Sequence, residues 1–236
     1  MERVEDLQLR GLKILRRDDL PGYTTDSVLL ADFAGGLRGK SVCDLGTGTG
    51  IIPLLLLGRR PELCVTGIEI EPELAALAQR SAALNGLEDT LRIVQGDLRK
   101  VDALLSAASF DAVICNPPYH SDAQGGPHSH QRFCTERDVA RAAARLLRPR
   151  GRLYLCCPAE GMFVFSSALQ QAGIEPKRAR LVASLPGRAP YLCLMEGALG
   201  ARGGCRVETP LILMEAPGKP GSEYKAIYHM EEDSQA

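Results

Sequence analysis

Four consecutive residues, Asn116-Pro117-Pro118-Tyr119, have types and an order that can do chemistry. They come directly after the apolar segment 110–115, which we expect to be a buried strand. The two prolines fix their own φ angles and bias the preceding residue toward extended backbone, so the turn is stiff. The side-chain oxygen of Asn116 and the carbonyl of Pro117 can each accept a hydrogen bond. Because a planar NH2 group offers two hydrogens to such a pair, the motif predicts a site for a planar amino nitrogen.

Holding both hydrogens would pull the nitrogen toward tetrahedral geometry and expose its lone pair to a methyl donor. No strong general base is needed, because the rate would come from alignment and from stabilising the developing positive charge. Tyr119 offers an aromatic face for a base or an amide plane. The alternative interpretation is an ordinary turn after a strand, which Asn-Pro also favours.

A glycine-rich loop, Asp44-Leu45-Gly46-Thr47-Gly48-Thr49-Gly50, lies upstream between a predicted strand and a predicted helix. Glycines there let the backbone turn sharply and let a ligand approach it closely. Nicotinamide dinucleotide folds use the spacing G-x-G-x-x-G for a pyrophosphate, whereas the spacing here is G-x-G-x-G. Asp44 stands just before the loop, where an anion disfavours a diphosphate and favours a cationic ligand. S-adenosyl-L-methionine, with its ammonium and sulfonium, is therefore the favoured cofactor; a dinucleotide and a plain strand-turn-helix are the alternatives.

Two further carboxylates stand at the ends of predicted strands. Glu69 closes the next strand and could accept hydrogen bonds from both hydroxyls of a ribose. Asp97 follows the third strand and could accept a hydrogen bond from the adenine amino group. Aspartate also favours the N-cap of a helix, and the two roles can coexist. The candidate cofactor residues from these segments are Asp44, Gly46, Thr47, Gly48, Gly50, Glu69, Ile70, Asp97 and Leu98. Asn116 is also a candidate cofactor residue.

Predicted strands and helices alternate along most of the chain. The expected strands are 41–45, 64–70, 91–95, 110–115 and 152–157, with weaker candidates at 178–183 and 191–196. The expected helices are 24–36, one starting at 51–57, 72–86, one through 139–147 that ends near 149–151, and 161–172. Such alternation predicts an α/β fold whose mostly parallel sheet is covered by helices on both faces.

Composition excludes several classes of protein. The 236 residues are 45% hydrophobic and 24% charged, as in ordinary globular proteins, and the net charge is −1. Any contact with nucleic acid must therefore depend on a local basic face. The eight cysteines form no C-x-x-C pair, so we expect packed free thiols rather than a metal site. We find neither a signal peptide nor a run of about 18 apolar residues, so we expect a cytoplasmic protein without a membrane span.

With these motifs in place, the chain resembles the class I amino-methyltransferases. More closely, it resembles the bacterial tRNA-Val adenine N6-methyltransferase family, which methylates an adenine beside the anticodon. The resemblance covers roughly residues 7–215. It rests on the segments 26–31, 44–53, 68–70, 96–97, 116–119 and 174–178, and on Asn85.

The resemblance implies a Rossmann-like class I methyltransferase fold with a mostly parallel seven-stranded sheet. It implies S-adenosyl-L-methionine as the cofactor and tRNA as the partner. Thr25 and Asp26 would close over the methionine end of the cofactor. The target base would be held by Asn116, Pro117, Pro118 and Tyr119. The expected organisation is an N-terminal segment with a cofactor-covering helix at 1–36, the methyltransferase domain at 37–215 and a frayed polar tail at 216–236.

Two basic or histidine-containing segments stay open to more than one interpretation. The segment 121–132, with His128 and His130, departs from the basic pattern usual in the family. We interpret it as an RNA-facing loop; exposed filler and, least favoured, a metal site are the alternatives, and no metal is expected. Four arginines at helical spacing form either a solvated face or a stripe that contacts phosphates: Arg137, Arg141, Arg145 and Arg148. Further cations follow at Lys177, Arg178, Arg180 and Arg188.

Other functions compete with the favoured one. A protein glutamine N5-methyltransferase uses the same tetrapeptide on a side-chain amide, but such enzymes usually carry a large helical N-terminal domain, and only residues 1–40 precede the first predicted strand. DNA and ribosomal RNA are further possible substrates. A non-catalytic RNA-binding protein could also retain this fold, although the intact Asp44, Glu69, Asp97 and Asn116 argue against it. The sequence does not determine the oligomeric state, and a monomer is one of the states left open.

Overall fold

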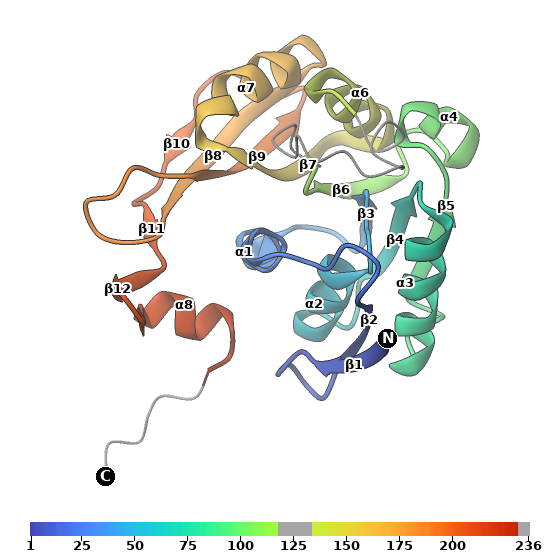
Figure 1. Ribbon diagram of the computed structural model, residues 1–236. Helices are drawn as coiled ribbons and strands as arrows, with labels where there is room; N and C mark the ends of the chain where they lie inside the picture. Colours follow the sequence, from blue (N-terminus) through green and yellow to red (C-terminus); the bar gives the residue numbers. More distant parts are fainter. Residues whose placement is uncertain (118–133, 231–236) are drawn as a thin grey trace.

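The computed structural model describes residues 1–117 and 134–230, and a central β-sheet dominates it (Figure 1). The long strands of the sheet are β3 (Ser41–Leu45), β4 (Cys64–Glu69), β5 (Leu91–Gln95), β6 (Phe110–Cys115), β7 (Leu147–Pro158), β8 (Ile174–Ala183) and β9 (Leu192–Leu199). Two short strands, β10 (Arg206–Val207) and β11 (Leu211–Ile212), pair with the outer edge of β8. The predicted seven-stranded sheet is thus confirmed, and β10 and β11 extend it.

The strand order is β10-β8-β9-β7-β6-β3-β4-β5. Strands β3 to β7 are parallel, and β9 runs antiparallel between β7 and β8. From the central β3 the chain proceeds outward to β4 and β5, then returns to β6 on the other side of β3. This reversal leaves a crevice at the carboxyl ends of the central strands, where open α/β sheets bind their ligands.

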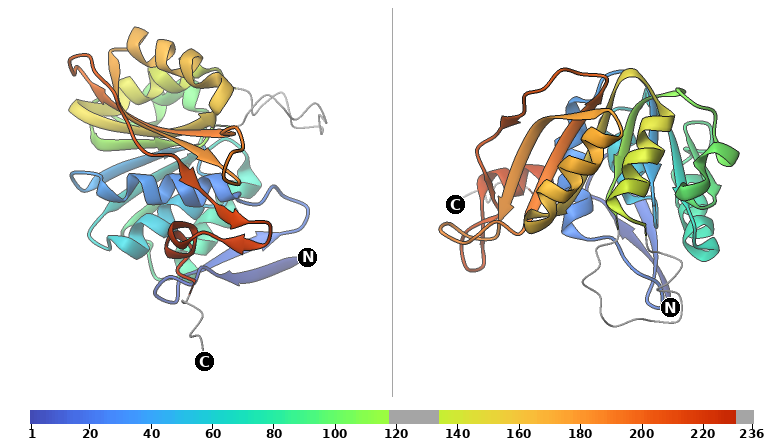
Figure 2. Two further views of the ribbon diagram at one scale, coloured as in Figure 1. Left: turned by 90° about the vertical axis from the view of Figure 1, so that its left-hand side faces the viewer. Right: turned by 90° about the horizontal axis from the view of Figure 1, so that it is seen from above.

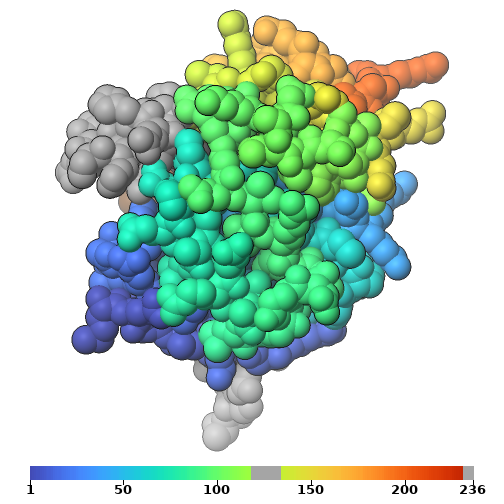
Figure 3. Space-filling view, turned by 90° about the vertical axis from the view of Figure 1, so that its right-hand side faces the viewer, coloured from blue at the N-terminus to red at the C-terminus, as the bar shows by residue number. Residues whose placement is uncertain are grey.

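Helices cover both faces of the sheet because the parallel strands are apolar on both faces. The helices are α1 (Thr25–Phe33), α2 (Ile51–Arg59), α3 (Pro72–Leu84), α4 (Val101–Leu104), α6 (Glu136–Leu146), α7 (Met162–Gln171) and α8 (Ser222–Ile227), with the short 3-10 helices η1 (Ala34–Gly36), η2 (Leu98–Lys100) and η3 (Ala159–Gly161). The core on one face is built with α1, α2 and α3, and the core on the other with α6 and α7. Figure 3 shows the side of the molecule that α3, β5 and the region of α4 cover, and Figure 2 shows the two layers from other directions.

Adjacent residues of one strand enter opposite cores, as the pleat requires. On β7, Cys156 packs into the core with α1 and α2, whereas Cys157 packs into the core with α6 and α7. All eight cysteines are free thiols, and six of them are buried. The expectation of packed free thiols is therefore confirmed for these six, whereas Cys64 and Cys205 are exposed.

An N-terminal hairpin docks on α3. Its strands are β1 (Glu2–Asp6) and β2 (Lys13–Arg17). The side chain of Asn85 accepts a hydrogen bond from the backbone N–H of Lys13 and donates one to its carbonyl, at 2.8 and 2.6 Å. The buried hydroxyl of Ser81 accepts a hydrogen bond from the N–H of Leu15 at 3.0 Å. These contacts give Asn85 a structural role.

Two predictions about local structure are wrong. The helix expected to end near 149–151 ends at Leu146, because Leu147 already pairs with Phe110 on β6. The expectation of a frayed tail is wrong for residues 216–230, where the strands β12 (Met214–Ala216) and β13 (Lys219–Pro220) lead into α8. The reason is that Ile227 is buried in the core and two half-buried tyrosines pack beside it, so the polar segment has an apolar anchor. Residues 231–236 lie outside the described part of the chain.

None of the helices in the described residues combines the length and apolar character of a membrane span. Within residues 1–117 and 134–230, no group of three His, Cys, Asp or Glu side chains is arranged to hold a metal ion. His128 and His130 lie outside these ranges. The division into three segments and the cytoplasmic location stay predictions.

Candidate active site

The glycine loop has the backbone that only glycine adopts without strain. Gly46, Gly48 and Gly50 have φ angles of +75°, +56° and +85°, in the left-handed region. The N–H groups of Gly46 and Thr47 both donate to the carbonyl of Ile68 at 2.9 Å, which ties the loop to the end of β4. A Cβ atom added at Gly46 or Gly48 would meet no atom within 4 Å, so the space beside the loop is open to a ligand.

Asp44, the last residue but one of β3, is fully buried beside this loop. Neither of its carboxylate oxygens makes a hydrogen bond of normal geometry to any described residue. Burial raises the pKa of Asp44 to about 7, and the charge of Glu69 adds to the rise, while the nearby hydroxyl of Thr47 opposes it. A buried carboxylate without a partner is costly, and a cationic group bound next to it would offset that cost.

Glu69 ends β4, the strand next to β3, and its side chain is held firmly. One carboxylate oxygen accepts a hydrogen bond from the N–H of Gly48 at 2.8 Å, and the other accepts one from the N–H of Glu71 at 2.9 Å. Burial raises the pKa of Glu69, and these backbone hydrogen bonds oppose the rise. Each carboxylate oxygen has a second lone pair, so Glu69 can still accept hydrogen bonds from a diol. Ile70 follows it and is half-buried.

Asp97 follows β5 and caps the short helix η2. One of its oxygens accepts a hydrogen bond from the N–H of Arg99 at 2.9 Å, and the carboxylate also pairs with the Arg99 guanidinium at 2.7 Å. The hydrogen bonds and charge of Arg99 lower the pKa of Asp97 although partial burial opposes this. The N-cap role of Asp97 is therefore confirmed. Its contact with adenine stays a prediction, as does the role of the half-buried Leu98.

Asn116 stands at the carboxyl end of β6, the neighbour of β3 on the other side. Leu45 pairs with Cys115, so Asn116 lies beside the start of the glycine loop. Its amide nitrogen donates to the hydroxyl of Ser27 at 2.9 Å, and its amide oxygen accepts a hydrogen bond from the thiol of Cys156 at 3.0 Å. These two contacts fix the orientation of the amide. Pro117 is buried, and Pro118 and Tyr119 lie outside the described residues.

The first turn of α1 forms the remaining wall. Thr25 and Asp26 begin this helix, and Ser27 within the same turn reaches Asn116. Burial raises the pKa of Asp26, and a hydrogen bond from Tyr191 opposes the rise. Tyr191 precedes β9, and its carbonyl accepts a hydrogen bond from the N–H of Ala159 at 3.0 Å, which places it at the carboxyl end of β7. An aromatic side chain that is 40% exposed therefore borders the site.

The structure brings the predicted site residues to one edge of the sheet, apart from the two that lie outside its described ranges. It also adds Ser27, Cys156 and Tyr191, which the sequence analysis did not count as site residues. Ser27 is part of the segment 26–31, and its polar side chain directly before the apolar run 28–31 was the available signal. The cysteine and the tyrosine gave no such signal, because nothing local marks them as neighbours of the site.

The site suits S-adenosyl-L-methionine. Two buried carboxyl groups, Asp44 and Glu69, lie at this edge of the sheet, and negative charge on them would repel the phosphates of a dinucleotide. The unpaired Asp44 fits the cationic amino-acid end, and the open space beside Gly46 and Gly48 leaves room for it.

Comparison with known families decides the classification. The family model of the methyltransferase small domain matches residues 24–163, which is more than half of the chain. The chain belongs to this methyltransferase family. Curated relatives agree: a tRNA1(Val) (adenine(37)-N6)-methyltransferase of Porphyromonas gingivalis is 31% identical over 184 residues, covering 73% of this chain and 72% of the relative. A protein of the same name from Tolumonas auensis is 27% identical and covers 86% of both chains.

Solved structures show the same fold for this methyltransferase. A predicted O-methyltransferase from Agrobacterium tumefaciens superposes with a TM-score of 0.73 at 22% identity, covering 87% of this chain and 96% of the other. The 16S rRNA N2 G1207 methyltransferase of Thermus thermophilus, solved with AdoMet and guanosine, gives a TM-score of 0.61 at 19% identity over 84% of this chain and 51% of that one. The predicted fold, the enzyme class of S-adenosylmethionine-dependent N-methyltransferases and the cofactor are confirmed.

Proposed function

We propose that this methyltransferase transfers the methyl group of S-adenosyl-L-methionine to N6 of an adenine in tRNA, at the position beside the anticodon. The main observation behind this proposal is the orientation of the Asn116 amide. Hydrogen bonds with Ser27 and Cys156 hold this amide beside the glycine loop and Asp44. An oriented amide oxygen beside a pocket for a cationic methyl donor suits transfer to a planar amino group. The names of the curated relatives support tRNA as the substrate.

In the proposed complex, the side-chain oxygen of Asn116 accepts one hydrogen of the adenine amino group, and the carbonyl of Pro117 accepts the second. Held in this way, the nitrogen would present its lone pair to the methyl group that the cofactor would supply from its sulfonium, and the displaced proton would leave to water. Pro118 and Tyr119 lie outside the described residues, and their contact with the base stays a prediction. The rate comes from alignment and from acceptors aimed at the developing positive charge.

The cofactor supplies the methyl group when it is bound. Asp44 would face its ammonium end, and Thr25 and Asp26 would close over that end. Glu69 and Ile70 would hold the ribose, and Asp97 and Leu98 would hold the adenine. Gly46, Thr47, Gly48 and Gly50 would let the cofactor approach the backbone of the loop closely.

The test is methyl transfer from labelled S-adenosyl-L-methionine into total bacterial tRNA, followed by nucleoside analysis. We expect N6-methyladenosine from the wild type. Asn116→Ala should lower kcat on the order of a hundredfold to a thousandfold, as loss of one aimed polar group does elsewhere. Cofactor binding by both proteins is checked by calorimetry, so that a loss of transfer is not a loss of the cofactor.

Label in protein glutamine, DNA or ribosomal RNA, with none in tRNA, would overturn the proposed substrate. Equal transfer by wild type and Asn116→Ala would overturn the proposed role of this residue. Asn116→Asp is the matched variant, since it keeps the shape of the side chain but replaces the donor to Ser27 with an acceptor.

A further inference from the structure

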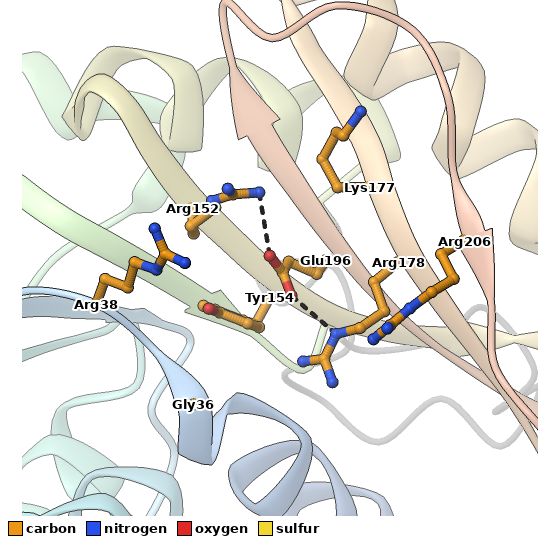
Figure 4. Close-up of a pocket in the computed structure, with 8 residues that line it drawn as sticks. All are labelled: Gly36, Arg38, Arg152, Tyr154, Lys177, Arg178, Glu196 and Arg206. Atoms are coloured by element: carbon orange, nitrogen blue, oxygen red, sulfur yellow. Dashed lines mark hydrogen bonds and ion pairs between the residues drawn. The ribbon is translucent and has the colours of Figure 1, made fainter.

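A second charged site lies on the same face of the sheet as α1, away from the carboxyl edge (Figure 4). It is a cavity of about 400 Å³, here named the β7–β10 pocket. Its lining residues are Gly36, Arg38, Arg152, Tyr154, Lys177, Arg178, Glu196 and Arg206. This volume is in the usual range of ligand pockets, roughly 300–1,000 Å³, but those are mostly apolar, whereas five of these eight side chains are cationic.

Strand register builds the pocket. Tyr154 pairs with Glu196, Glu196 with Arg178, and Arg178 with Arg206, so one row of side chains crosses β7, β9, β8 and β10. A register shift between Pro176 and Arg178 accompanies the unusual placing of Lys177 and Arg178 in the same pocket. Arg38 comes from the segment after η1, on the other side of the cavity.

The charges in the pocket do not balance. Glu196 pairs with Arg152 at 3.1 Å and with Arg178 at 2.8 Å, and Glu208 at the rim pairs with Arg206 at 2.7 Å. Lys177 donates to the backbone carbonyls of residues 202 and 204 at 3.0 and 2.7 Å. Neither Lys177 nor Arg38 has a carboxylate partner in the part of the chain that the structure describes. Five cations thus share two carboxylates, and an anion would relieve their mutual repulsion.

Arginines favour one kind of anion. The planar guanidinium matches the oxygens of a phosphate group in a two-point contact, and several arginines around one cavity are typical of phosphate recognition. Arg38 and Arg206 are exposed at the rim, so they are available to a large ligand. An open rim suits a phosphate carried on a chain better than a small molecule that must be enclosed.

Helix α1 connects this pocket to the candidate active site. Its last residue, Phe33, accepts a hydrogen bond from Arg178 through its carbonyl at 2.8 Å, and the Arg178 guanidinium carbon lies 3.8 Å from the centre of the Phe33 ring. Near the other end of the helix, Ser27 bonds to Asn116. Six residues of helix span about 9 Å. The pocket and the candidate active site therefore lie at the two ends of one short helix.

We infer that the β7–β10 pocket binds a backbone phosphate of the RNA whose base enters the active site. This inference rests on the proposed function, because it takes the substrate to be RNA. Inorganic phosphate presents the same oxygens as a backbone phosphate of RNA, so it is the alternative ligand of this pocket.

The test compares the double variant Arg38→Gln/Arg206→Gln with the wild type and with Arg92→Gln. Arg92 is an exposed arginine on β5, at the opposite edge of the sheet, so it is the matched control for loss of charge. Binding of an in vitro transcribed tRNA is measured by fluorescence anisotropy from 50 to 200 mM salt. We expect the Kd of the double variant to rise on the order of tenfold at low salt, with a salt slope flatter by about one for each lost phosphate contact. Arg92→Gln and cofactor affinity should be unchanged.

Equal tRNA affinity of the double variant and the wild type, with methyl transfer intact, would overturn the pocket assignment and leave the proposed function standing. If the wild type neither binds nor methylates tRNA, both the proposed function and the pocket assignment are wrong. Inorganic phosphate alone is the second probe, read by thermal unfolding. If phosphate stabilises the wild type but not the double variant while tRNA affinity stays equal, the pocket takes free phosphate and the RNA assignment is wrong. Arg38→Glu, a single exposed change, repeats the comparison without altering any ion pair among the described residues.

Discussion

The carboxyl edge of the sheet and the β7–β10 pocket hold charges of opposite sign, and they hold them in opposite ways. At the carboxyl edge, Asp44 is fully buried and has no hydrogen-bond partner of normal geometry among the described residues. In the pocket, Arg178 and Arg152 keep 23% and 30% of their side chains exposed and share Glu196. A buried charge is costly until its ligand arrives, whereas a partly exposed charge is screened by water and salt.

This difference indicates what each region can recognise. A buried carboxylate without a partner can select strongly for a small cationic ligand over neutral or anionic ligands, because only a cation neutralises its charge. Half-exposed arginines attract an anion over a longer range and with a strong dependence on salt. We therefore propose that the carboxyl edge holds the chemistry and the cofactor, and that the pocket contributes RNA affinity.

The largest effect is expected from Asp44→Asn on stability as a function of pH. The pKa of Asp44 is raised from 3.8 to about 7 in the folded protein. Below about pH 4 the carboxyl group is protonated in both the folded and the unfolded protein, so it does not lower the free energy of unfolding. Between about pH 4 and 7 the unfolded chain has released the proton but the folded protein still holds it, so the free energy of unfolding falls as the pH rises. The full penalty is present above pH 7 and amounts to roughly 4 kcal/mol from the 3.8 and 7 values. Asp44→Asn removes it.

Urea unfolding of wild type and Asp44→Asn at pH 5, 6, 7 and 8 measures this effect. The free energy of unfolding of the variant should exceed that of the wild type by an amount that grows with pH. The cofactor should stabilise the wild type more than the variant, since it neutralises the carboxylate. Parallel pH curves for the two proteins would show that Asp44 is not an uncompensated charge, and the contrast between the two regions would be lost.

A smaller effect is expected from Ser27→Ala. The hydroxyl of Ser27 orients the Asn116 amide at 2.9 Å, so its loss should lower kcat on the order of tenfold through misalignment. The Kd for tRNA should stay unchanged, since Ser27 lies at the carboxyl edge. Single-turnover methyl transfer and anisotropy give the two values. Ser167→Ala on α7 is the control variant. A higher Kd for tRNA with unchanged kcat in Ser27→Ala would contradict the proposed roles of the two regions.

The smallest effect is expected on the helix α6 face. Arg145 pairs with Asp102, and Arg141 donates to the carbonyl of Arg99 at 2.7 Å. The prediction that Arg148 shares this helix face is wrong, because α6 ends at Leu146 and Arg148 lies on β7, where it pairs with Asp111 at 2.6 Å. Because these side chains already have partners, the double variant Arg141→Gln/Arg145→Gln should raise the Kd for tRNA by only about twofold. Fluorescence anisotropy measures the Kd for tRNA of this variant and of Arg38→Gln/Arg206→Gln under the same conditions. A loss as large as that of Arg38→Gln/Arg206→Gln would instead favour the α6 stripe as the phosphate contact.

Local rules explain why much of the site could be predicted from the sequence. Glycines at 46, 48 and 50 are needed for their positive φ angles, and apolar runs bounded by turn residues predict buried strands. The positions of Asp44, Glu69 and Asp97, at or just after the end of such strands, predicted that they lie at the carboxyl edge of the sheet. The same rules failed at residues 216–230, where a polar segment is ordered by the burial of Ile227, a contact with a distant part of the chain.

By itself, the sequence determined the order of the motifs, the parallel α/β fold and the residues that lie at the carboxyl edge, because each depends on neighbours within a few positions. Only the tertiary structure decided that Ser27 and Cys156 hold the amide of Asn116, which is 89 residues from the first and 40 from the second. Only strand order and register decided that Tyr154, Glu196, Arg178 and Arg206 form one row. Side-chain neighbours across a sheet depend on which strands pair and in which register, and the packing of the whole chain sets that pairing.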